Sequence, residues 1–174
     1  MRADTVRVLA ARAEELFLSR EMYCAEAIVT VLNEGFGGGL ERERARGLAM
    51  GFGEGLGKAG CVCGALSGAV LAASWFLSSS LPPAKVREAA RGLHDAFKKE
   101  HGSSCCRVLT RHVRAEPARH FAHCAGLTRV GAELAARTIL EHMPELASHH
   151  LRHVPRRGRS KAAALLRRLA DRLG

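Results

Sequence analysis

The stretch between Lys58 and Lys85 limits the fold more than any other part of this chain, because it carries no charged side chain. A transmembrane helix needs about 20 predominantly apolar residues. This stretch is diluted by small and polar residues, so we expect a helix buried at the centre of a helical bundle instead of a membrane span. The diluting residues are Gly60, Gly64, Gly68, Ser67, Ser74, Ser78, Ser79 and Ser80.

Apolar residues recur at helical spacing through the rest of the chain, and no run alternates with the period of a strand. Aromatic residues make up only 5% of the chain, while Ala, Leu, Arg and Glu dominate it, which favours helices over sheets. The predicted fold is therefore all-α, a compact helical bundle of about six to seven helices with a basic C-terminal helical tail. The expected helices cover residues 3–20, 22–33, 40–51, 62–78, 82–101, a segment after Ser103 or Ser104, and 117–143.

Glycines inside and between these helices lead to two further predictions. The cluster from Gly35 to Gly39 should end the second helix and form a turn. Gly64 and Gly68 fall inside the predicted helix 62–78, where glycine costs about 1 kcal/mol relative to alanine. We therefore expect another helix to pack closely against this one.

Positive charge is concentrated at the C-terminal end of the chain. The formal net charge is +10, and residues 149–174 contribute eight Lys or Arg and a single Asp to it. The globular part is therefore only mildly basic, and we do not expect it to bind nucleic acid. The predicted division is a cysteine-containing helical domain over residues 1–146 and a basic linker with a short C-terminal helix over residues 147–174, capped by Ser160.

The first fifteen residues contain several charged side chains and no apolar core of the kind found in secretory signals. We expect a cytoplasmic protein, in which thiols stay reduced by default. The six cysteines are then better explained by metal binding or redox chemistry than by structural disulfides.

Most of the cysteines fall near predicted helix starts. A helix N-terminus presents free amide donors and a partial positive charge, both of which stabilise a thiolate, the form that attacks disulfides and binds metals. A single buried cysteine is often only a small apolar filler. Two closely spaced pairs at two helix starts are less easily explained in that way. The cysteines are Cys24, the Cys61 and Cys63 pair, the adjacent Cys105 and Cys106, and Cys124.

Several segments together resemble the C_GCAxxG_C_C family of redox-active proteins, which is named for its cysteine pattern. Residues 63–68 read CGALSG and match the family's CGAxxG motif. Residues 23–27 resemble its first cysteine helix, and residues 97–109 resemble its third cysteine segment. With Cys124 and the helix that follows it, the resemblance covers residues 1–146.

This resemblance implies four shared cysteines, which are Cys24, Cys63, Cys106 and Cys124. Cys61 and Cys105 are additional to the family pattern, as is the basic tail, and both cysteines are possible accessory thiols. From the residues themselves we expect Cys63 to react first, with Cys61 as its nearest competitor. Burial should oppose ionisation of Cys24 and Cys124.

Other known site patterns are missing from the sequence. No CxxC pair supports a zinc ribbon, and the glycine clusters match neither a P-loop nor a dinucleotide fingerprint. His101 and His123 lie close in sequence to cysteines, so either could act as a metal ligand or as a base for a thiol.

The four shared cysteines should therefore converge in space and form one redox or ligand site. Two chemistries fit that expectation: thiol–disulfide exchange without a cofactor, and an iron–sulfur cluster or a zinc ion held by the same four thiolates. The protein would then be an oxidoreductase or an electron-transfer protein, with a redox partner that the sequence does not identify and with a homodimer as one assembly. The alternative is a helical binding module with structural cysteines, whose basic tail contacts nucleic acid or an anionic membrane.

Overall fold

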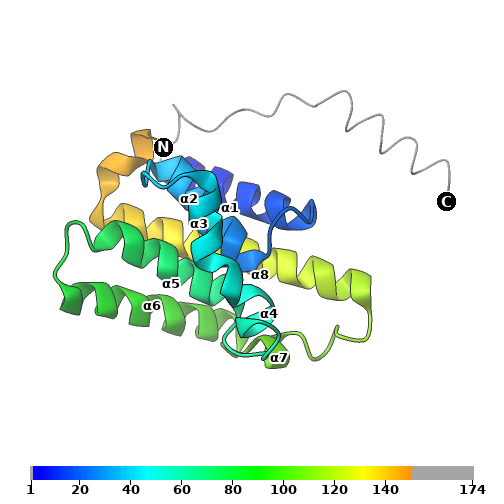
Figure 1. Cartoon of the computed structure of the whole chain (residues 1–174). Helices are drawn as coiled ribbons and strands as arrows, with labels where there is room; N and C mark the ends of the chain where they lie inside the picture. Colours follow the sequence, from blue (N-terminus) through cyan, green and yellow to red (C-terminus); the bar gives the residue numbers. More distant parts are fainter. Residues whose placement is uncertain (1, 150–174) are drawn as a thin grey trace, which may run out of the picture.

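The computed structural model describes residues 2–149, and that part of the chain is a bundle of helices without a strand (Figure 1). The predicted all-α fold is thereby confirmed. The predicted basic linker and last helix lie outside the described residues, apart from their first few positions. The elements are α1 (Arg2–Leu18), α2 (Cys24–Phe36), α3 (Arg42–Ala49), the 3₁₀ turn η1 (Met50–Phe52), α4 (Gly53–Leu56), α5 (Gly64–Leu77), α6 (Pro83–His101), α7 (Cys106–Leu109), α8 (Pro117–His142) and the 3₁₀ turn η2 (Pro144–Ser148).

The uncharged stretch forms α5, and it lies in the middle of the bundle as expected. Helix α5 packs against α2, α6 and α8, while α8 also runs along α1 (Figure 1). Its buried face is made almost entirely of alanine, glycine and a few larger apolar residues. In the part of the chain that the structure describes, no helix is long and apolar enough to cross a membrane.

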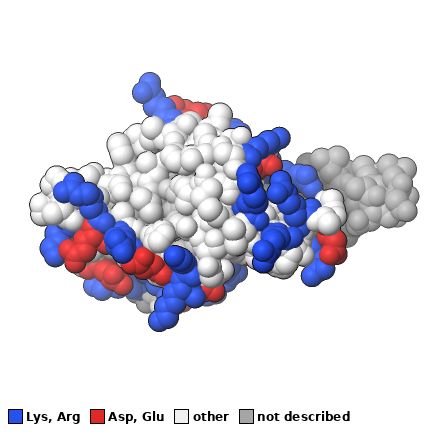
Figure 2. Space-filling model, turned by 90° about the horizontal axis from the view of Figure 1, so that it is seen from below, with Lys and Arg blue, Asp and Glu red and all other residues white. Residues whose placement is uncertain are grey.

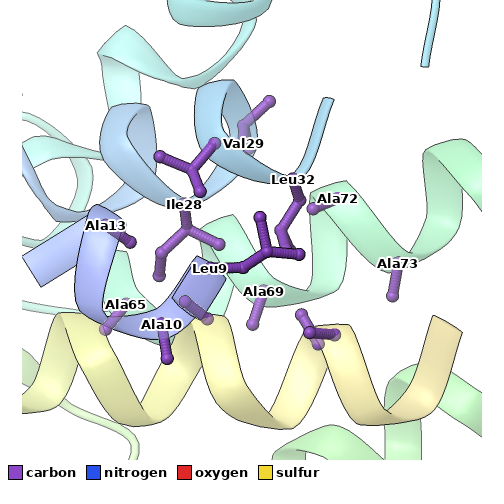
Figure 3. Close-up of a cluster of buried hydrophobic side chains, with 14 of the residues drawn as sticks. Leu9, Ala10, Ala13, Ile28, Val29, Leu32, Ala65, Ala69, Ala72 and Ala73 are labelled. Atoms are coloured by element: carbon purple, nitrogen blue, oxygen red, sulfur yellow. The ribbon is translucent and has the colours of Figure 1, made fainter. Parts of the chain in front are cut away.

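The hydrophobic core lies between α1, α2, α5 and α8. Figure 3 shows Leu9 of α1 between Ile28 and Leu32 of α2 and the alanine-rich face of α5. Leu9, Ile28 and Leu32 are fully buried, and the alanines opposite them leave room for these larger side chains. Burial of such side chains contributes most of the stability of a helical bundle.

Helix α2 extends three residues beyond the predicted end at residue 33. Gly35 lies inside the helix, where an added Cβ would come within 2.4 Å of the Leu9 side chain, so close packing with α1 accounts for this glycine. Gly37 ends the helix with a left-handed φ of 68°, and its N–H donates to the carbonyl oxygen of Asn33. The glycine cluster therefore ends the helix at its second member instead of its first.

The C-terminal end of the described chain packs on the bundle. The hydroxyl group of Thr5 in α1 donates a hydrogen bond to the carbonyl oxygen of Ala147 at 3.3 Å, and Ala147 is buried. A Cβ added at Gly37 would lie 2.6 Å from the ring of His149. Residues 147–149 thus contact α1 and the end of α2.

Candidate redox site

Four free thiols line one cavity of about 910 Å³. Cys24 is the first residue of α2, Cys63 is the residue immediately before α5, and Cys106 is the first residue of α7. Cys124 lies in the second turn of α8. The structure therefore brings together the four cysteines that the sequence grouped as one site, although they come from four different helices.

The two glycines of the CGALSG segment allow α5 to approach α2 at the site. A Cβ added at Gly64 would lie 2.4 Å from the sulfur of Cys24, and one added at Gly68 would lie 2.7 Å from the Cα of Ala25. The two positions are four residues apart, so they lie on one face of the helix. This contact explains why the motif needs glycine at both positions.

Cys61 and Cys105 form a disulfide bond, with their Cα atoms 4.5 Å apart. The sequence analysis expected Cys61 and Cys105 to be accessory thiols. It did not predict that they would bond to each other. The bond connects the segment before α5 to the segment before α7, each of which also carries a cavity cysteine. Two backbone hydrogen bonds join the same segments: Cys63 N–H donates to Ser104 O at 2.8 Å, and Arg107 N–H donates to Gly60 O at 2.9 Å.

Burial controls the ionisation of three of the thiols. It raises the pKa of Cys63 to about 11 and that of Cys124 to about 12, and it raises the pKa of Cys24 still further. Nearby thiolates act in the same direction: charge on Cys63 raises the pKa of both Cys24 and Cys124. The expectation that burial opposes ionisation of Cys24 and Cys124 agrees with this geometry.

Burial also opposes the reactivity that the sequence predicts for Cys63. Backbone N–H groups of Ala65 and Leu66, in the first turn of α5, do lower the pKa of Cys63, as the helix-start argument requires. Desolvation is the larger effect, because the Cys63 side chain is only 3% exposed. The structure thus argues against Cys63 as the first thiol to react, and Cys61 is held in the disulfide.

Cys106 has a different environment from the other three thiols. It is half-buried, and burial followed by the charge of Glu54 raises its pKa. The guanidinium group of Arg114 acts in the opposite direction and lowers that pKa. Among the four cavity thiols, only Cys106 has a cationic side chain among the groups that favour its thiolate.

Basic side chains outnumber acidic ones on the cavity wall. Arg46 pairs with the buried carboxylate of Glu26 at 2.8 Å, and Lys58 pairs with Glu54 at 3.7 Å. Figure 2 shows Lys and Arg side chains gathered at one end of the face seen from below, next to a broad area without charged side chains. The basic side chains of the wall are Arg20, Arg46, Lys58, Arg107 and Arg114, and the acidic ones are Glu21, Glu26 and Glu54.

Aromatic side chains form another part of the wall. The rings of Phe17 and Phe121 stack with their centroids 4.9 Å apart, and the guanidinium group of Arg20 lies 4.6 Å from the centre of the Phe121 ring. Tyr23 also lines the cavity and is largely exposed. The wall therefore combines apolar surface with cationic groups, an arrangement suited to an organic anion.

The thiols are chemically suited to a soft metal or an iron–sulfur cluster, but their arrangement does not provide a site for one. Among residues 2–149, no group of three or more His, Cys, Asp or Glu side chains is placed so that it could hold a metal ion. Cys24, Cys63, Cys106 and Cys124 share a cavity without forming a ligand set.

The two histidines singled out in the sequence do not line the cavity. The ring of His101 contacts Phe97, the ring of His123 contacts His112, and the Nε2 atoms of His101 and His123 are buried. His120 does line the cavity, although the sequence analysis did not select it. Its position one helical turn before Cys124 was the available signal, since residues four apart share a helix face.

Comparison with known proteins supports the same assignment. A family model described as "Putative redox-active protein (C_GCAxxG_C_C)" matches residues 22–138, which include all six cysteines. No curated protein and no solved structure matches the chain.

Proposed function

The chain belongs to the C_GCAxxG_C_C family of redox-active proteins, and from that premise we propose that its cavity thiols perform thiol–disulfide exchange with a small disulfide substrate. The observation that carries this proposal is the placement of four free thiols on one cavity whose wall also offers cationic and aromatic side chains. A dithiol pair that faces a ligand-sized cavity can reduce a bound disulfide without a cofactor.

Cys106 is the attacking thiol in this proposal, because it is half-buried and Arg114 favours its thiolate. The Cys106 thiolate attacks one sulfur of the substrate disulfide. The substrate S–S bond breaks, a new S–S bond joins Cys106 to half of the substrate, and the other half leaves as a thiolate that takes up a proton.

A second cavity thiol completes the reaction. It attacks the Cys106 sulfur of the mixed disulfide, forms an intramolecular disulfide and releases the second half of the substrate as a thiol. Two protein thiols are oxidised and one substrate disulfide is reduced to two thiols. Charge on Cys106 raises the pKa of Cys24, Cys63 and Cys124, but for Cys24 it is the smallest of the effects, so Cys63 and Cys124 are the candidates for this role.

The cavity wall favours a substrate that carries negative charge. Glu26 and Glu54 are paired with Arg46 and Lys58, and Glu21 lies 3.6 Å from Arg42 outside the wall, which leaves Arg20, Arg107 and Arg114 as the remaining charges on the wall. Guanidinium groups bind carboxylates with directed hydrogen bonds. We therefore assign the substrate to the class of small organic disulfides that bear carboxylate groups.

The alternatives from the sequence have less support. The thiols are not arranged as metal ligands, so electron transfer through a bound cluster is the weaker form of the redox proposal. A binding module that acts through the basic tail depends on residues beyond 149, which lie outside the described part of the chain.

The test compares two small disulfides of opposite charge, dithiodiglycolate and cystamine, on the fully reduced protein. Thiol release should be faster with the anionic dithiodiglycolate, and the difference should shrink as salt is added. In a background that also carries Cys61→Ser and Cys105→Ser, so that no surface thiol reacts, the Cys106→Ser variant should release no substrate thiol. Replacement of the resolving cysteine, in Cys63→Ser or in Cys124→Ser, should leave a mixed disulfide at Cys106 that mass spectrometry detects. If the reduced wild-type protein releases thiol from neither reagent, the proposed exchange does not occur.

A further inference from the structure

The Cys61–Cys105 disulfide lies outside the cavity. Neither cysteine lines the cavity wall, whereas Cys63 and Cys106, each one or two residues away in sequence, do so. Cys61 is exposed and Cys105 is half-buried, so the bond can be reached by a molecule too large to enter the cavity. The Cys61–Cys105 pair is therefore separate from the four thiols that line the cavity.

Cys61 lies close to Cys106 as well as to Cys105, to which it is bonded. The hydrogen bonds from Arg107 N–H to Gly60 O and from Cys63 N–H to Ser104 O lie on either side of these cysteines, since Cys61 is between Gly60 and Cys63, and Cys105 and Cys106 are between Ser104 and Arg107. A Cβ added at Gly55 would lie 2.9 Å from both the Cβ of Cys106 and the backbone nitrogen of Cys61, which shows independently that the two residues are close.

The two segments do not depend on the disulfide for their connection. Besides the two backbone hydrogen bonds, the guanidinium group of Arg107 donates to the carbonyl oxygen of Ala59 at 2.8 Å. Opening of the disulfide therefore leaves the segments joined, with Cys61 still close to Cys106. A bond that only held the loops together would duplicate contacts already present.

We propose that Cys61 and Cys105 form a second redox centre, which relays oxidising equivalents from a disulfide on a large partner molecule to the cavity thiols through Cys61 and Cys106. This inference rests on the proposed function, because the exchange in the cavity is reversible: two small substrate thiols return the oxidised cavity pair to thiols and leave as a disulfide, which completes the cycle. The partner class is a protein or polymer with an exposed disulfide, as distinct from the small disulfide that enters the cavity.

The relay is a sequence of balanced thiol–disulfide exchanges. The Cys106 thiolate attacks the Cys61 sulfur, so the Cys61–Cys105 bond breaks, a Cys61–Cys106 bond forms and Cys105 leaves as a thiol. A second cavity thiol then attacks the Cys106 sulfur and releases Cys61 as a thiol. The cavity pair has been oxidised and the surface pair reduced, and a disulfide of the partner reoxidises Cys61 and Cys105 while its own two sulfurs become thiols.

The test uses a pyridyl disulfide attached directly to a large branched dextran polymer, a reagent whose bulk lies next to the disulfide and keeps it out of the cavity. It is added to three fully reduced proteins: wild type, Cys61→Ser and Cys105→Ser. All three start without the surface disulfide, so any difference in stability that the bond itself causes does not enter the comparison. After acid quenching, alkylation and peptide mass spectrometry identify the cavity disulfide and the polymer-bound cysteines.

The relay predicts an asymmetry between the two variants. Cys105→Ser should still oxidise its cavity pair, because Cys61 accepts the polymer and passes oxidation directly to Cys106. Cys61→Ser should lose most of that rate. A disulfide with a purely structural role would make the two variants equivalent, so equal rates of cavity oxidation in Cys61→Ser and Cys105→Ser would overturn the relay.

A parallel measurement with dithiodiglycolate separates this inference from the proposed function. The small reagent enters the cavity without the surface pair, so all three proteins should react with it at similar rates, which also shows that the variants keep an intact cavity. Failure of dithiodiglycolate on all three proteins would overturn the proposed function. Reaction of all three with dithiodiglycolate together with equal polymer rates in the two variants would overturn the relay alone.

Discussion

Gly131 of α8 lies against the carbonyl oxygen of Ala65 in α5, so closely that an added Cβ would come within 2.5 Å of that oxygen. Ala65 is the third residue of the CGALSG segment, and its neighbour Gly64 touches the sulfur of Cys24. The approach of α8 to α5 therefore positions the cavity wall at Ala65 and also determines how the two helices pack in the core. Replacement of this glycine tests that relationship.

Gly131→Ala should destabilise the protein, because a backbone carbonyl cannot move aside as a flexible side chain can. Overpacking of this kind costs about 1–3 kcal/mol of unfolding free energy. Gly126→Ala is a matched control on the same helix, since an added Cβ there meets nothing within 4 Å. It should stabilise the protein by about 0.5–1 kcal/mol through the unfolded chain. Urea denaturation measures both changes, and equal effects of the two substitutions would contradict the packing argument.

The ion pair between Arg46 and Glu26 leads to a second prediction. The Glu26 side chain is 2% exposed, and the Arg46 guanidinium group, which lies 2.8 Å away, is partly exposed. Arg46→Ala would leave a buried carboxylate without its cation, at an expected cost of about 1–3 kcal/mol of unfolding free energy. Arg44→Ala, at an exposed position of the same helix, should change stability by less than about 0.5 kcal/mol. Similar losses of unfolding free energy in both variants would show that the Arg46–Glu26 pair does not stabilise the protein more than an exposed arginine does.

Sequence reasoning located the helices well, because their apolar periodicity and their caps are local signals. The uncharged stretch became the central helix, and Gly64 and Gly68 mark its contact with α2 as expected. Helix ends were harder to predict: α2 continues through Gly35, since tertiary packing against Leu9 outweighs the low helix propensity of glycine. Propensity describes a residue alone, whereas burial depends on a partner distant in sequence.

Sequence order and flanking residues grouped four cysteines as one site, and in the structure these four thiols line one cavity. The bonding and reactivity of the cysteines were less accessible from the sequence. The bond between Cys61 and Cys105 depends on two segments that meet only in the folded chain. The expectation that Cys63 reacts first stays a prediction, because the helix-start effect behind it is local while the desolvation that opposes it arises from packing.

The charges beside Cys106 give a third prediction. Arg114 lowers the pKa of this thiol and Glu54 raises it, so Arg114→Gln should move the pH profile of Cys106 alkylation upwards and Glu54→Gln should move it downwards. At neutral pH the first variant should therefore be alkylated more slowly than wild type and the second faster. Arg111→Gln removes an exposed charge of the same loop and serves as the control. Iodoacetamide rates with mass-spectrometric site identification measure the effect, which should weaken in high salt.

If Arg114→Gln and Arg111→Gln shift the profile equally, the effect comes from net charge and not from the position of Arg114. If neither Arg114→Gln nor Glu54→Gln changes the profile, neither side chain controls the Cys106 thiol.

The buried thiols also predict how the stability of the reduced protein depends on pH. The pKa of Cys63 rises from its ordinary value of 9.0 to about 11 in the folded protein. Between these values the unfolded chain gives up the proton while the folded chain keeps it, so rising pH favours the unfolded state. The contribution is therefore complete below about pH 9 and is lost progressively towards about pH 11. At about pH 10 the loss from Cys63 alone should be about 1.4 kcal/mol.

Cys24 and Cys124 act in the same direction, because burial raises their pKa values as well. Urea denaturation of the reduced protein at a series of alkaline pH values, in a phosphine reductant, measures the slope. Cys63→Ala should lower stability at neutral pH through the lost side chain, but its stability should fall less steeply with pH than that of wild type. The slope of unfolding free energy against pH depends only on the protons taken up or released on unfolding, whereas the lost side chain shifts the whole curve. Parallel curves for wild type and Cys63→Ala would mean that Cys63 ionises as readily in the folded protein as in the unfolded chain, and the burial that disfavours it as the first thiol to react would lose its support.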